Sequence, residues 1–284
     1  MRRSTLAAVA AIACLVSACG DNAPANDGSL PKFEENIDTW SLPLDAYIPD
    51  PVTLEYAVNA SIATCMQELG LKFTLIDPRR TVPAAYSSRL RYLFNLENAQ
   101  KYGYRADKPG QTSNAVSHGA PGQEAKVEQC SLKAGRELDT SNPLLSLAQG
   151  FGGQAYEQAK ESNALVEPSA KWRECMLPLG VPDLPESPVE GSMPTDSQRV
   201  RFGTSDRMKA YKVPISALEV KEAVADAKCR DESRFTRTLY REEVRFELEA
   251  IRDHQGDLDK ALEYAQEVEE KGSDAIREAG GTGS

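Results

Sequence analysis

The sequence predicts a mainly α-helical protein built from two similar halves, each closed by a disulfide, with long loops and a long C-terminal helix or helical hairpin. Three observations predict this fold. Cys-Met followed by Leu-Gly occurs twice, in TCMQELG at residues 64–70 and ECMLPLG at residues 174–180. Four of the six cysteines lie beyond residue 40, two in each half, and no proline occurs after Pro214. We expect the halves to span residues 41–165 and 166–284.

The chain begins with the pattern of a bacterial secretion signal. Two arginines precede an apolar run that is shorter than the roughly 20 residues of a membrane-spanning helix. The next residues, VSAC at 16–19, resemble the lipobox of bacterial lipoproteins. This resemblance implies that residues 1–18 are a signal peptide and that Cys19 becomes the lipidated first residue. The alternative is ordinary cleavage near Ala18, which would leave an exposed thiol outside the cell.

Residues 19–40 are expected to form a lipid-anchored flexible tether, because they are rich in Asn, Asp, Gly and Pro and show no periodicity. Such a segment has a root-mean-square reach of roughly 25 Å. Acyl groups on Cys19 would hold the protein in the lipid bilayer, at the outer, extracytoplasmic face of the cytoplasmic membrane. The formal charge of -10 argues against binding to nucleic acid and against a polybasic membrane contact.

Apolar spacing predicts a helix up to each Cys-Met pair. In the first half, apolar residues at intervals of three and four predict a helix that starts near Pro51 and stops at Gly70. In the second half the corresponding helix is shorter, with Ser169 as its N-cap. Two further helices carry Cys130 and Cys229. The order of a Cys-Met helix, a loop and a second Cys helix therefore occurs twice.

Disulfides are expected among Cys65, Cys130, Cys175 and Cys229, since they form an even set in an oxidising compartment. Four cysteines allow three pairings, between which sequence alone does not choose strictly. If the halves are copies, Cys65 pairs with Cys130 and Cys175 pairs with Cys229. Each ring would then contribute on the order of 4 kcal/mol in the chain-entropy model.

The order of these motifs resembles secreted lipoproteins of actinobacteria whose function is unknown. The resemblance rests on LPLDAY at 42–47, YGYR at 102–105 and VADAKC at 224–229, together with the lipobox and the two Cys-Met segments. It implies a helical protein with two disulfides on the outer face of the membrane, and it brings no activity. Such genes often stand beside exporter-type transporter genes, which implies an accessory role in a transporter complex.

From Ser216 to the end the sequence predicts helices, interrupted at DHQGD, residues 253–257. Five arginines at spacings of three and four would lie along one side of the first of these helices: Arg230, Arg234, Arg237, Arg241 and Arg245. Such a stripe is suited to a phosphate-bearing envelope polymer, anionic headgroups or an acidic partner. The alternative is a solvated helix face balanced by neighbouring glutamates, which is usual for exposed helices.

Residues 72–108 combine basic and aromatic side chains, and we take Tyr92, Tyr102 and Tyr104 as candidate binding residues. Tyrosine and arginine give rigid contact area and directional hydrogen bonds, so glycans, peptides or a protein partner are candidate ligands. The alternative is that this loop-rich segment packs its aromatics on the helices and pairs its charges with the acidic end of the chain.

Motifs for metal, cofactor or nucleophilic chemistry are missing from the sequence. It contains no Cys-x-x-Cys, no His-Glu-x-x-His and no Gly-x-Ser-x-Gly, and the carboxylates near residue 257 lack the spacing of a calcium loop. We therefore assign no catalytic residue, metal or cofactor. The expected function is that of a binding, accessory or scaffold component of an envelope or transporter complex. The alternative is a cell-wall-acting hydrolase whose carboxylate pair no motif reveals.

Overall fold

The computed structural model describes residues 30–76, 89–105, 117–189, 193–206 and 213–281. The predicted signal peptide and Cys19 lie outside these ranges. The described chain is mainly helical, which confirms the predicted fold class. Its α-helices are α1 (Pro51–Glu68), α2 (Leu96–Tyr102), α3 (Glu124–Glu137), α4 (Leu144–Lys160), α5 (Val166–Met176), α6 (Asp196–Phe202), α7 (Ala217–Glu232) and α8 (Phe235–Gly281). Two short antiparallel strands, β1 (Phe73–Thr74) and β2 (His118–Gly119), pair Phe73 with Gly119.

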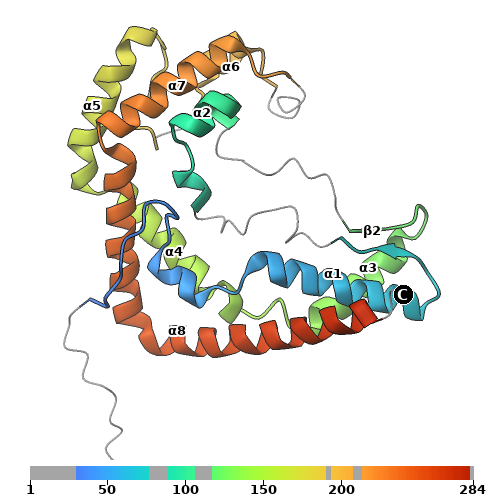
Figure 1. Ribbon diagram of the computed structural model, residues 1–284. Coiled ribbons are helices and arrows are strands. Elements are labelled where there is room, and N and C mark those ends of the chain that lie inside the picture. Colours follow the sequence, from blue (N-terminus) through green and yellow to red (C-terminus); the bar gives the residue numbers. More distant parts are fainter. Residues whose placement is uncertain (1–29, 77–88, 106–116, 190–192, 207–212, 282–284) are drawn as a thin grey trace, which may run out of the picture.

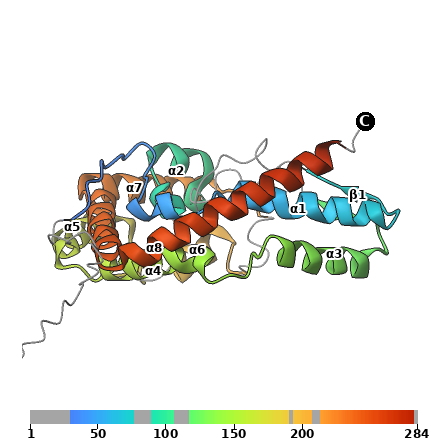
Figure 2. The same ribbon diagram turned by 90° about the horizontal axis from the view of Figure 1, so that it is seen from below.

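The long helix α8 extends from one end of the molecule to the other (Figure 1). Helices α2, α5, α6 and α7 gather near its start, and α1 and α3 lie near its end; in Figure 2 α3 runs beside α1. The interruption predicted at residues 253–257 is confirmed, because His254 has a non-helical conformation (φ -126°, ψ 22°) at which two helical arms of α8 meet in a kink. The His254 ring stacks on Phe151 of α4, with ring centroids 4.4 Å apart. The C-terminal element therefore consists of two helical arms that meet at His254 and run in different directions, whereas the arms of a hairpin would lie side by side (Figure 1).

Two disulfides close the two helix pairs that the sequence predicts. Cys65 of α1 is bonded to Cys130 of α3, and Cys175 of α5 is bonded to Cys229 of α7. This confirms the pairing that follows from the repeat. The bonds are consistent with an extracytoplasmic location, because disulfides persist in oxidising compartments. Within the described ranges, no helix is both long and apolar enough to cross a membrane.

The repeated Cys-Met phrase ends a helix in both halves. Met66 and Met176 follow the bonded cysteines and are fully buried. Gly70 (φ 71°) and Gly180 (φ 63°) adopt the left-handed conformation in which glycine commonly terminates a helix. The phrase is therefore a structural element that combines a disulfide, a core contact and a helix stop.

The predicted cap of the second Cys-Met helix is wrong. Helix α5 begins at Val166, so Ser169 lies inside its first turns and is buried. The helix starts earlier because a short 3-10 turn, Asn163–Leu165, leads directly into it, and Ser162 accepts a hydrogen bond from the Ala164 N–H at that turn. The cap expected at Ser216 is present, since its hydroxyl oxygen accepts from the Glu219 N–H at 3.0 Å.

The sequence predicted one continuous helix carrying five arginines, and this prediction is wrong. Helix α7 ends at Glu232 and α8 begins at Phe235, with Arg234 in the left-handed conformation (φ 61°) between them. The cause is tertiary packing, because the turn places Phe235, 1 % exposed, in a hydrophobic cluster with Tyr92 and Leu239. The chain therefore changes direction at Arg234, and we call this junction the α7–α8 corner.

The two predicted halves are packed against each other. Helix α8 packs on α1 and α4, and α2 packs on α7, so contacts cross the predicted division at residues 165 and 166. Close packing at the far end of α8 is shown by Gly272, where an added Cβ atom would lie 2.8 Å from the Cβ atom of Ala57 on α1. Only glycine allows α1 and α8 to approach this closely.

We expect Gly272→Ala to lower the free energy of unfolding by about 1 kcal/mol, since overpacking costs about 1–3 kcal/mol and improved helix propensity returns about 1. Gly153→Ala in α4 is the matched control, because nothing lies within 4 Å of an added Cβ there. It should stabilise the protein slightly. Chemical denaturation measures both effects, and stabilisation by both substitutions would contradict the tight α1–α8 contact.

Candidate functional site

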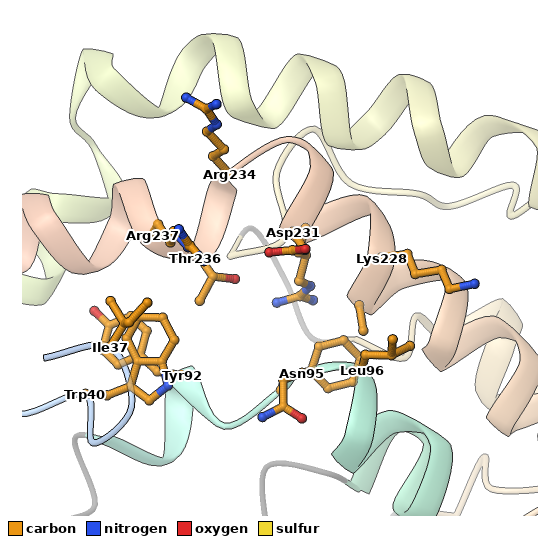
Figure 3. A pocket seen from close by; sticks show the side chains of 13 residues that line it. Ile37, Trp40, Tyr92, Asn95, Leu96, Lys228, Asp231, Arg234, Thr236 and Arg237 are labelled. Carbon is orange, nitrogen blue, oxygen red and sulfur yellow. The ribbon is translucent and has the colours of Figure 1, made fainter.

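The α7–α8 corner forms one wall of a pocket of about 290 Å³ (Figure 3). Three segments that are distant in sequence line it. Ile37 and Trp40 come from the end of the predicted tether, residues 92–96 lead into α2, and residues 227–237 form the corner itself. The volume lies near the lower limit for small-molecule sites. We call this cavity the corner pocket.

The floor of the corner pocket is aromatic and its mouth is apolar. Trp40 stacks on Tyr92 with ring centroids 5.2 Å apart, and both rings meet the buried Tyr240 edge-on. Ile37 and Leu96 remain 40 % and 41 % exposed. A rigid stack of aromatic rings thus lies beside exposed aliphatic side chains, which is the character of a recognition surface.

Part of the predicted tether is packed against α8. Phe33 and Trp40 contact the hydrophobic cluster at the start of this helix. The Asn36 N–H donates to the Tyr240 hydroxyl at 3.3 Å, and Glu35 forms an ion pair with Arg241 at 3.1 Å. The last residues of the range 19–40 are therefore held on the domain, and they build the pocket.

Arg230 lies inside the site and is held by its neighbours. Its Nε and Nη2 groups donate to the two carboxylate oxygens of Asp226 at 2.8 and 3.1 Å. The indole N–H of the buried Trp172 donates to the same carboxylate at 2.8 Å. The guanidinium carbon of Arg230 lies 4.7 Å from the centre of the Phe94 ring. These contacts fix the guanidinium at the wall of the pocket.

Three cations form the rim of the corner pocket. Lys228, Arg234 and Arg237 are exposed, and none of them forms an ion pair with another residue in the described part of the chain. In Figure 3, Lys228 and Arg234 extend away from the centre of the pocket, while Thr236 lies between Trp40 and Asp231. Among the described lining residues Asp231 is the only carboxylate.

The predicted arginine stripe is divided between two roles. Arg241 pairs with Glu35, and Arg245 pairs with Glu242 at 3.0 Å and Glu249 at 2.8 Å. These two residues follow the alternative of a balanced helix face. Arg234 and Arg237, by contrast, lie at the corner pocket without a carboxylate partner among the described residues.

The described part of the segment 72–108 follows the alternative of a structural role, in which its aromatic residues pack on the helices and its charges pair with acidic residues. Arg91 forms an ion pair with the buried Glu243 at 3.0 Å, and Arg105 forms one with the buried Glu219 at 3.2 Å. The Tyr92 hydroxyl donates to Glu243. The positive segment is therefore fastened to the acidic helices α7 and α8 by pairs that are mostly removed from solvent.

Of the three candidate tyrosines, only Tyr92 lines the corner pocket. Tyr104 is buried and stacks between Phe94 and Phe202, and Tyr102 is half-buried beside Lys101. Sequence reasoning missed Trp40, Phe94 and Thr236 as site residues. One signal was available, since a tryptophan inside a segment rich in Asn, Asp, Gly and Pro is unusual for a flexible tether.

A second pocket of about 210 Å³ adjoins the first, and the two share Phe94, Arg230 and Thr236. Arg91 and Tyr156 contribute polar groups to it, and no carboxylate lines it among the described residues. The corner therefore separates two cavities whose common wall carries a guanidinium and a hydroxyl group.

Glu243 and Glu247 are one turn apart on α8 and nearly fully buried. Burial raises the pKa of Glu243 to about 7, against the opposing effect of Arg91, and raises that of Glu247 to about 8. Neither residue lines the corner pocket or the pocket that adjoins it. In the part of the chain that the structure covers, no group of His, Cys, Asp and Glu side chains could hold a metal ion.

Comparison with known proteins adds no family to these observations. No protein-family model, no curated protein and no solved structure matches the chain. The chemistry of the corner pocket therefore follows from its own residues, which are aromatic and aliphatic inside and cationic at the rim.

We expect Glu247→Gln to remove a pH dependence of stability. Glu247 accepts a hydrogen bond from the Leu44 N–H at 2.9 Å, which glutamine preserves. Its pKa is raised from 4.5 to about 8 by burial, so ionisation disfavours the folded state, and stability falls as pH rises through this window. Relative to the variant, the native chain should lose on the order of 2–4 kcal/mol between pH 5 and 9.

Urea denaturation at several pH values measures this difference. Glu263→Gln on the exposed face of α8 is the control, and it should leave the pH profile of the native chain unchanged. A native profile that runs parallel to that of Glu247→Gln would show that Glu247 is ionised at no cost in the folded protein.

Proposed function

We propose that this protein is an extracytoplasmic lipoprotein, anchored in the membrane through Cys19, that acts by binding as an accessory component of an envelope or transporter complex. The observation that carries the proposal is the corner pocket, where the end of the predicted tether meets Tyr92 and the unpaired Arg234 and Arg237. The described disulfides and the signal and lipobox patterns support the location.

The short distance along the chain between anchor and pocket supports a role near the membrane. Residue 37 is 18 positions beyond residue 19 (37 minus 19), so a fully extended connection spans at most about 65 Å. A relaxed connection of this length spans roughly 25 Å. The pocket would therefore remain within reach of proteins or molecules at the outer membrane face.

Binding is favoured over hydrolysis by the composition of the pockets. A glycosidase requires two carboxyl groups on either side of the scissile bond. The described lining of the two pockets supplies Asp231 alone, whereas it supplies several arginines and aromatic rings. Arginine and aromatic side chains are typical of recognition sites. The hydrolase alternative therefore lacks its acid–base pair at these positions.

The anchor is tested by metabolic labelling with a radioactive or clickable fatty acid. We expect the native chain to be labelled and Cys19→Ser to lose the label and leave the membrane fraction, because a single acylated cysteine would provide the only lipid attachment. Cys14→Ser is the matched control and should remain labelled, since residue 14 lies within the predicted signal peptide. Labelling that survives Cys19→Ser would refute the anchor.

The binding role is tested by photo-crosslinking in cells. A photoreactive residue at Leu96, in the mouth of the corner pocket, should capture a specific envelope component identified by mass spectrometry. The same residue at Leu132, which is more exposed (59 %) but lies on α3, is the control and should not capture it. Equal capture at both positions would contradict binding at the corner pocket.

A further inference from the structure

We infer that the corner pocket binds an organic anion that carries an apolar group, with the anionic oxygens on Arg230 and Thr236 and the apolar group on Trp40. This inference rests on the proposed binding function and names the ligand chemistry of the same site. The anionic group is a carboxylate or a phosphate, since a guanidinium and a hydroxyl recognise both through the same hydrogen bonds.

The wall shared by the two pockets presents hydrogen-bond donors. A guanidinium has five N–H groups, and Arg230 uses only its Nε and one Nη2 group for Asp226, so donors remain. The Thr236 hydroxyl has no hydrogen-bond partner among the described residues, and in Figure 3 it lies beside the open space of the pocket. Because both residues line both cavities, an oxyanion at this wall would satisfy groups that the protein leaves unsatisfied.

The rim supplies positive charge that the fold does not neutralise. Lys228, Arg234 and Arg237 have no ionic partner in the described ranges, although the whole chain carries a net charge of -10. Arg241 and Arg245 on the same helix are paired with carboxylates. Other exposed cations of the described chain, such as Lys72 and Lys221, also form no ion pair, so the distinguishing feature of the rim is that three such cations gather at one pocket. The α8 N-terminus adds a partial positive charge at Thr236. Two described carboxylates oppose an anion here: Asp231 lines the pocket, and Asp226 pairs with Arg230 at 2.8 Å.

The apolar part of the ligand follows from the floor and mouth of the pocket. Trp40 lies on Tyr92, and Ile37 and Leu96 are about two-fifths exposed beside them. An inorganic anion would leave this surface in water, whereas a ligand with an apolar group buries it and gains free energy in proportion to the area. The small volume limits that group to the size of a ring or a short chain.

Backbone strain is concentrated at the same pocket. In the described ranges three residues other than glycine have a positive φ, and two of them, Trp40 (φ 52°) and Arg234 (φ 61°), line the corner pocket. Such conformations cost energy and cluster at ligand sites. They agree with the assignment, because the two strained residues lie on separate segments that line one cavity.

The test is an equilibrium binding measurement on the full chain carrying Cys19→Ser. The fluorescence of Trp40 reports the binding. The probes are 4-phenylbutyrate and octyl phosphate, with the neutral 4-phenylbutan-1-ol and the small acid butyrate as matched controls. We expect at least one acidic probe to bind at least 10-fold more tightly than both controls. The tighter of the two acids identifies carboxylate or phosphate as the preferred group. Equal affinity for 4-phenylbutyrate and its neutral alcohol, with no binding of octyl phosphate, overturns the inference.

Substitutions locate the binding at the corner pocket. Arg237→Gln should weaken binding of the acidic probe about 2- to 5-fold, whereas Arg241→Gln, one turn further along α8 and outside the pocket, should leave it unchanged. Asp231→Asn should tighten binding by a similar factor, because it removes the opposing charge. All three positions are exposed, so circular dichroism should show unchanged folding. Equal effects of the two arginine substitutions would place the anion elsewhere.

Trp40→Phe controls for the signal, since the other tryptophan of the chain, Trp172, is fully buried. The ligand-dependent change in fluorescence should disappear in this variant, while calorimetry still detects binding.

Failure of the ligand class is distinguishable from failure of the proposed function. A specific crosslink at Leu96 without binding of either acidic probe would reject the organic anion and retain the binding role.

Discussion

The turn at Arg234 is the constraint on which the arrangement of this protein depends. A helix that continued from α7 would leave Phe235 outside the core, whereas the left-handed turn buries it against Tyr92 and Leu239. The turn separates α7, which is joined to α5 by a disulfide, from α8, which reaches α1 at its other end. This one local conformation therefore sets the directions of α7 and α8 relative to each other, and it forms one wall of the corner pocket.

Buried carboxylates explain how the acidic helices hold the basic segment. Helices α7 and α8 place five acids in the interior: Glu219, Glu222, Asp226, Glu243 and Glu247. Four of them are paired with arginines, two of which, Arg91 and Arg105, come from the segment that precedes and follows α2. Removing one partner of such a pair would leave a buried charge, so each pair fixes position more than it adds stability. Glu247 has a backbone N–H as its partner instead of an arginine, and burial raises its pKa to about 8 against the opposing effect of that hydrogen bond.

The charged residues that hold the fold together lie apart from the cations at the rim of the corner pocket. The arginines that join elements of the fold form ion pairs with carboxylates. Arg230 is held by Asp226, which also accepts a hydrogen bond from Trp172. The cations at the rim of the corner pocket have no such partner in the described structure. The anion site that we propose lies where these paired residues end and where Trp40, at the end of the predicted tether, lines the pocket.

Periodicity and glycine conformation act locally, so the sequence alone predicts the helical class and the helix stop at Gly70. Its internal repeat favours, among three possible pairings, the disulfide pairing that the structure shows. The break predicted at DHQGD is present at His254. The tertiary structure placed the turn at Arg234, since burial of Phe235 outweighs the local preference for a continuous helix. It also decided which arginines are paired. Ion pairs such as Arg241 with Glu35 join residues far apart in sequence, so spacing along a helix cannot reveal them.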